Sequence, residues 1–161
     1  MKQDRFLLGI LLFIILLVIT AVALFFIRQD TQTYLPDDAP EGVVYNYALA
    51  LQNRDFELAY SYLADEENKP DFTSFRQAYL SRQLDLSNNA IRVGEVTLNP
   101  DDEQAMVTVT VLYASSGPFA EGWSSTETAT LIQQEDGWKI TYMPNPYWGW
   151  DWYQVLPAPV K

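Results

Sequence analysis

The side chains that usually perform acid–base and nucleophilic chemistry are few in this sequence. Its 161 residues contain no histidine and no cysteine. Their absence excludes Ser-His and Cys-His nucleophilic pairs, and zinc sites built on imidazole or thiolate. No glycine-rich phosphate-binding loop occurs, so nucleotide binding has no support. Carboxylates and tyrosines are therefore the groups left to consider as acids, bases or ligands.

Tyrosines recur at spacings that place them on one side of the expected helices and strands. These residues are Tyr47, Tyr60, Tyr79, Tyr113 and Tyr142. Such a set can line a cavity in which one Asp or Glu acts as a base, but the same spacing is typical of aromatic core residues. The run Asp101-Asp102-Glu103 falls in an expected turn and lacks the ligand order of a calcium loop. No inward-facing carboxylate is assigned, so we expect no enzyme activity, no catalytic or metal-binding residue and no cofactor.

The C-terminal segment has an unusual density of aromatic residues. Five of them lie close together: Tyr147, Trp148, Trp150, Trp152 and Tyr153. Three interpretations are open. The segment folds back and caps the open end of the domain, it forms a patch for a protein or glycan partner, or it lies at a membrane surface. Tryptophan and tyrosine concentrate binding energy at protein interfaces and are also enriched at the membrane–water boundary.

An apolar run near the N-terminus, residues 6–27, contains no charged side chain. A helix of this length measures about 33 Å and crosses a hydrocarbon core of about 30 Å, so we predict one transmembrane helix. A cleaved signal peptide is the alternative, because Ala21-Val22-Ala23 matches a small-x-small cleavage pattern. Against it, the run is longer than a signal core, and cleavage there would leave Leu24–Ile27 exposed.

The charges that flank the apolar run predict its orientation. Lys2 and Arg5 precede it, whereas Arg28 is followed by an excess of acidic residues. Positive residues stay on the cytoplasmic side of a membrane helix. We therefore predict a single-pass protein of the cell membrane, with its N-terminus in the cytoplasm and its large domain outside.

The net charge of the chain is −11, and residues 1–27 carry a net +1 from Lys2, Arg5 and Asp4, which leaves −12 on the remainder. Nucleic-acid binding depends on basic side chains that neutralise phosphates, so no nucleic-acid partner is expected. The same charge disfavours docking onto anionic lipids, so membrane attachment must come from residues 6–27.

Apolar residues recur at helical spacing in three segments after residue 39. The first helix begins after Asp38 and the second after Asp55, with each aspartate expected to act as an N-cap. The third helix is expected from Thr73 to Gln83.

From residue 91 the pattern changes from helical to alternating. Ala105 to Tyr113 is the clearest strand, Gly94 marks a change of parity that a bulge would produce, and Asp136-Gly137 predicts a hairpin turn. Three helices followed by about four antiparallel strands predict an α+β fold. We expect the helices to pack on a curved sheet and form a cone.

Two stretches resemble a known family. Pro40–Leu51 followed by Arg54–Tyr60 resembles the first two helices of NTF2-like domains, and Glu135–Ile140 resembles their last hairpin. The similarity covers about residues 40–157. With the apolar helix and the aromatic exit, it extends to the membrane-anchored NTF2-like N-terminal domain of some penicillin-binding proteins. Their transpeptidase motifs, Ser-x-x-Lys, Ser-Asp-Asn and Lys-Thr-Gly, do not occur here, so the resemblance implies an accessory domain without catalytic residues.

These patterns predict five regions. They are a cytoplasmic N-terminus (1–5), a transmembrane helix (6–27), a stalk (28–39), an NTF2-like domain (40–143) and an aromatic, proline-rich tail (144–161). The stalk spans at most about 40 Å. We predict a non-catalytic binding or scaffold protein of the bacterial cell envelope, with an envelope protein or glycan as partner. A small-molecule or isomerase-like cone with a carboxylate base is the alternative, and a homodimer through the open sheet face is a third hypothesis.

Overall fold

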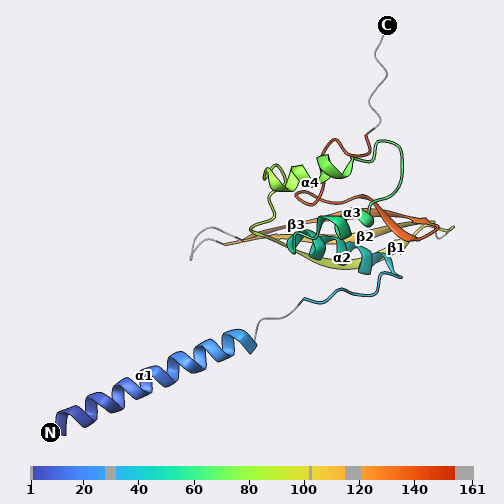
Figure 1. Cartoon of the computed structure of the whole chain (residues 1–161). Helices are drawn as coiled ribbons and strands as arrows, with labels where there is room; N and C mark the ends of the chain where they lie inside the picture. The colour runs from blue at the N-terminus through green and yellow to red at the C-terminus, as the bar shows by residue number, and fades with distance from the viewer. Residues whose placement is uncertain (1, 28–31, 102, 115–120, 155–161) are drawn as a thin grey trace. The chain divides into compact units, whose positions relative to one another are not determined.

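The computed structural model describes residues 2–27, 32–101, 103–114 and 121–154 (Figure 1). The chain divides into two compact units, Met1–Thr33 and Tyr34–Lys161. The first unit contains one helix, α1 (Lys2–Ile27). Its segment Leu7–Leu24 is long and apolar enough to cross a membrane, a property that a signal sequence shares, and none of it is buried within the protein.

Three helices open the second unit: α2 (Pro40–Gln52), α3 (Phe56–Ser61) and α4 (Phe72–Leu80). The Asp55 side chain accepts a hydrogen bond from the backbone N–H of Leu58, so the predicted cap of α3 is confirmed. The predicted cap at Asp38 is wrong. The N-cap of α2 is Ala39, which offers no side-chain acceptor, and Pro40 follows with a backbone angle suited to the first helical turn.

The third helix differs from its prediction at both ends. α4 begins at Phe72, after Asp71, whose side chain accepts hydrogen bonds from the N–H and hydroxyl of Ser74. It ends at Leu80 rather than Gln83, because Arg82 adopts a left-handed backbone conformation with φ of 60°. A left-handed residue stops an α-helix.

Four antiparallel strands follow in the order β1-β2-β3-β4: β1 (Asn89–Leu98), β2 (Gln104–Tyr113), β3 (Trp123–Gln134) and β4 (Gly137–Tyr142). The register of β1 against β2 shifts between Val93 and Val96, which confirms the bulge expected at Gly94. The predicted hairpin between β3 and β4 is confirmed, but Gln134 pairs with Gly137, so the turn is Glu135-Asp136, one residue earlier than predicted, and Gly137, with φ of 116°, begins β4.

The helices cover one face of this sheet. Alternate residues of β2 (Ala105, Val107, Val109 and Val111) are buried beneath them, whereas Met106 on the opposite face is 54% exposed. Helix α2 contacts β1, β2 and β4, and therefore reaches both edges of the sheet. The predicted α+β fold, with three helices on a four-stranded antiparallel sheet, is confirmed (Figure 1).

The polar segment before α2 is bound to the folded unit. The Asn46 side chain, which is 1% exposed, accepts a hydrogen bond from the N–H of Leu35 (2.8 Å) and donates one to its carbonyl (2.7 Å). The backbone of Pro36 lies so close to Gly42 that a side chain at position 42 would collide with it. The residues that connect α1 to the second unit are therefore 28–33, fewer than the predicted stalk of 28–39.

Candidate functional site

The aromatic C-terminal segment lies inside the second unit. Strand β4 is half the length of β3 and leaves the first part of β3 without a neighbour on that edge. After β4 the chain crosses the helix-covered side, where the Tyr113 hydroxyl donates a hydrogen bond to the Asn145 carbonyl (3.0 Å). Met143 and Tyr147 have no exposed surface, and Trp148 and Trp152 are buried. Figure 1 shows the segment, in red, beside α4.

Two buried hydroxyl groups hold this segment at one backbone atom. The Tyr147 carbonyl accepts hydrogen bonds from the hydroxyls of Tyr47 (2.8 Å) and Tyr79 (2.9 Å), whose oxygens are 3.1 Å apart. Burial raises the pKa of both tyrosines, and the contact between them raises that of Tyr47 further. Both tyrosines are therefore neutral hydrogen-bond donors at physiological pH, and they hold the C-terminal segment in place through the Tyr147 carbonyl.

The raised pKa values predict loss of stability in alkaline solution. Tyrosines of the unfolded chain ionise near pH 10, whereas Tyr47 and Tyr79 stay neutral in the fold. Their stabilising contribution is thus complete below pH 10 and is lost as pH rises, by about 1.4 kcal/mol per pH unit for each tyrosine. Urea titrations between pH 9 and 11 measure this slope. It is expected to decrease in a Tyr47→Phe, Tyr79→Phe variant; an unchanged slope in the double variant contradicts the prediction.

Ring contacts extend this anchorage along the segment. Trp152 packs against Phe75 with ring centroids 5.3 Å apart, and against Tyr79 at 6.2 Å. Trp148 contacts Trp152 at 5.2 Å and stacks on Tyr153 at 5.5 Å. The Tyr153 hydroxyl donates to the carbonyl of Ala64, and its backbone N–H donates to that of Asn68. The segment is thus fastened at Tyr147 and again at Tyr153.

Trp150 is the exception among the five aromatic residues of the tail, because 75% of its surface is exposed. The predicted patch is therefore divided by the fold. Tyr147, Trp148 and Trp152 are core residues, Tyr153 is half-buried, and Trp150 faces solvent.

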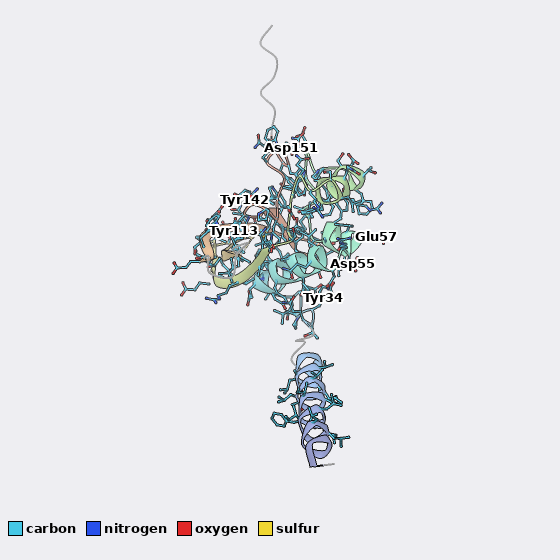
Figure 2. The ribbon with its side chains drawn as sticks, turned by 90° about the vertical axis from the view of Figure 1, so that its left-hand side faces the viewer. Tyr34, Asp55, Glu57, Tyr113, Tyr142 and Asp151 are labelled. Carbon is cyan, nitrogen blue, oxygen red and sulfur yellow. The ribbon has the colours of Figure 1, made fainter. Side chains whose placement is uncertain are left out.

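The five tyrosines proposed as a cavity lining do not share one cavity. Tyr47 and Tyr79 meet in the core, and Tyr60 is half-buried and donates to the carbonyl of Pro70. Tyr113 stacks on Trp123 with ring centroids 3.8 Å apart, and Tyr142 is 43% exposed. A register shift between Thr130 and Leu131 moves Tyr142 off the face that Ile140 occupies. Figure 2 shows Tyr113 and Tyr142 on the sheet, away from Asp55 and Glu57.

One inward carboxylate was missed by the sequence reasoning. Glu127 pairs with the buried Val109 in the sheet register and is half-buried on the helix-covered face. It accepts a hydrogen bond from the Ser125 hydroxyl (2.9 Å), and its charge adds to burial in raising the pKa of Tyr113. The alternation of β3 could have identified it, because Glu127 shares parity with the buried Ala129 and Leu131.

Metal binding has no structural counterpart in the part of the chain that is described, where no group of three or more His, Cys, Asp or Glu side chains lies together. Asp101 and Glu103 are exposed, and Asp102 lies outside the described residues.

Comparisons with known proteins give likenesses of fold and no family. No family model and no curated protein matches the sequence. The solved structures of similar fold include the following three. A SEC-C motif containing protein from Rhodopseudomonas palustris has 13% identity and a TM-score of 0.49 over 67% of this chain and 79% of its own. A cystatin-like-fold protein of unknown function from Nostoc punctiforme has 9% identity and a TM-score of 0.45, covering 61% and 80%.

The third is a protein of the NTF2-like family from Streptomyces avermitilis, with 16% identity and a TM-score of 0.40 over 61% of this chain and 86% of its own. Identities and TM-scores in this range do not assign the chain to a family. No penicillin-binding protein is among these three.

Proposed function

We propose that this chain is a membrane-anchored, extracytoplasmic binding module of a bacterial cell envelope, without catalytic activity. One observation carries the proposal: the protein's own C-terminal segment is packed into the core of the second unit, while one of its tryptophans stays exposed. The Tyr147 side chain is fully buried, and the backbone carbonyl of Tyr147 accepts hydrogen bonds from the hydroxyls of Tyr47 and Tyr79. The same segment presents Trp150 to solvent.

Membrane attachment through α1 supports the proposal. The 18 residues of Leu7–Leu24 have the length and composition of a membrane span. The connection of residues 28–33 spans at most about 22 Å when extended. A partner of the module is therefore expected close to the outer face of the membrane.

Trp150 is the proposed centre of the partner contact. A large aromatic side chain costs little conformational entropy when it becomes buried at an interface, and tryptophan is enriched among residues that dominate binding energy. The neighbouring aromatic side chains Tyr147, Trp148 and Trp152 are buried in the core, whereas Trp150 is exposed. An envelope protein or a glycan is the expected partner. The alternative partner is a second copy of the chain, bound through the open sheet face.

The cysteine-free sequence allows a single test of location and partner. A cysteine introduced at Asp151, next to Trp150 (Figure 2), is labelled in intact cells with a membrane-impermeant maleimide that carries a photo-crosslinker. We expect labelling without permeabilisation, and after illumination one defined adduct to an envelope protein or glycan. The adduct is expected to disappear when Trp150→Ala is added.

Two control variants complete this experiment. Glu57→Cys, exposed on α3, is expected to be labelled but to give no adduct, because it lies away from Asp151 (Figure 2). Lys2→Cys is expected to be labelled only after permeabilisation. Labelling of Lys2→Cys in intact cells would contradict the orientation, and identical adducts from Asp151→Cys and Glu57→Cys would contradict a partner site at Trp150.

Glu127 favours a second candidate function, a small-molecule cone with a carboxylate base. This carboxylate lies beside Tyr113 on the helix-covered face. Its test is a small molecule that raises the melting temperature of the wild-type chain and fails to do so for Glu127→Gln.

A further inference from the structure

A hollow of about 600 Å³ opens where helices α2 and α4 end. Its lining combines the apolar side chains of Phe56, Tyr79, Leu84 and Leu86 with polar side chains that include Arg54 and Arg82. The volume falls within the range of small-molecule sites. The site lies apart from Trp150 and from Glu127, neither of which lines it.

Both arginines occupy the same unusual position. Arg54 follows the C-cap of α2 and Arg82 follows that of α4, and each has φ of 60°. The left-handed residue after a helix is usually glycine, because any larger side chain is strained there. A basic residue does stabilise a helix C-terminus, but any position in the last turn supplies that charge without strain. Two arginines at strained positions on one hollow therefore indicate a use for the guanidinium groups themselves.

Arg54 and Arg82 supply the positive charge of the hollow. Among the residues that the structure describes, neither forms a salt bridge; the two ion pairs found join Lys69 to Asp65 and Lys139 to Asp136. Asp85, also in the lining, is engaged by the N–H and hydroxyl of Ser87, and these bonds, with a smaller contribution from the charge of Arg82, lower the pKa of its carboxyl. Two arginines and one aspartate leave the lining with an excess of positive charge in a chain whose net charge is −11.

We propose that this hollow binds a small organic anion, with its carboxylate or phosphate head between Arg54 and Arg82 and its apolar body against the apolar side chains of the lining. The planar guanidinium group donates two parallel hydrogen bonds to such a head, which lysine cannot do. A compact aromatic or branched body matches the aromatic and leucine side chains of the lining. The inference goes beyond the proposed partner site and does not depend on it.

Calorimetric titration of the full chain in phosphatidylcholine nanodiscs tests the site, with phenylacetate and phenyl phosphate as anionic probes. Benzyl alcohol is the neutral probe of similar shape, and empty nanodiscs correct for partition into lipid. We expect saturable binding of at least one anion, and binding of benzyl alcohol weaker by at least about tenfold.

The variants decide which side chains carry the binding. Arg54→Gln with Arg82→Gln is expected to reduce the affinity for the anion by at least about tenfold. Arg76→Gln, exposed on α4 outside the hollow, is expected to leave it unchanged. Arg54→Lys with Arg82→Lys keeps the charge and is expected to bind with intermediate affinity, which also serves as a check that the hollow is intact.

Three results would overturn this site: no saturable binding of either anion at millimolar concentration, equal affinity for benzyl alcohol, or full affinity in the glutamine double variant. Tryptophan fluorescence of each variant shows whether the fold is retained. The crosslinking adduct at Asp151 is measured separately, so failure here leaves the partner-binding proposal standing, and failure there leaves this site standing.

Discussion

Tyr147→Ala is expected to lower the free energy of unfolding of the second unit by about 4 kcal/mol. The side chain has no exposed surface and belongs to the main core cluster. Its removal leaves a cavity among groups that are fixed by other contacts, since the Tyr147 carbonyl remains bound to Tyr47 and Tyr79. Domains of this size have a stability of about 5–15 kcal/mol, so the change removes a large share of it.

Urea unfolding of the full chain in detergent micelles measures this loss. All five tryptophans lie in the second unit, so their fluorescence reports on its unfolding without a signal from α1. Trp150→Ala is the matched control from the same segment, and because this side chain is 75% exposed its effect is expected to stay within about 0.5 kcal/mol. Equal effects of the two substitutions would show that the C-terminal segment is not part of the core.

The sequence predicted correctly those parts of the fold that depend on residues adjacent in the chain. The alternation from Ala105 to Tyr113 predicted β2, because burial on one face of a strand follows directly from its period of two. Asp55 and Gly94 were predicted correctly for the same reason, as a cap and a bulge depend on a few adjacent residues. Asp38 failed because Ala39-Pro40 supplies an equally acceptable helix start one residue later.

The arrangement of the aromatic segment could not be predicted in this way. Tyr147 is 100 residues from Tyr47 and 68 from Tyr79 in the sequence, and no local pattern predicts that their hydroxyls meet its carbonyl. Trp148, Trp150 and Trp152 have even spacing, yet the middle one alone is exposed. The segment is neither helix nor strand, so no period relates its side chains to one face. Which aromatic residue remains for a partner is therefore decided by tertiary packing.

The connection to α1 shows the same limit. A polar stretch with a proline is typical of a linker, and 28–39 was predicted as one stalk. A single buried amide changes this, because Asn46 provides both an acceptor and a donor to the backbone of Leu35, as a neighbouring strand would. Asparagine in the middle of a helix gives no signal of such a contact. Its burial separates residues 34–39 from the rest of the predicted stalk.

Asn46→Ala is expected to destabilise the second unit by about 2–3 kcal/mol and to release the segment that begins at Tyr34. Each of its two hydrogen bonds to Leu35 contributes about 1 kcal/mol, and the partly buried backbone groups left without partners add to the loss. The connection between α1 and the folded unit would then lengthen from residues 28–33 to about 28–39. The proposed partner site at Trp150 could then lie over a wider range of distances from the membrane.

Hydrogen exchange at the Leu35 amide measures this release directly, because its N–H donates to the Asn46 side chain in the wild-type protein. We expect its protection to be lost in Asn46→Ala, while amides in the centre of β2 stay protected. Asn53→Ala is the control for loss of an asparagine from the same helix, since Asn53 is exposed and its long contact with the Tyr34 hydroxyl (3.5 Å) does not involve Leu35. If exchange at Leu35 is unchanged by Asn46→Ala, the segment is held instead by the close packing of Pro36 on Gly42, and the longer stalk predicted from the sequence does not form.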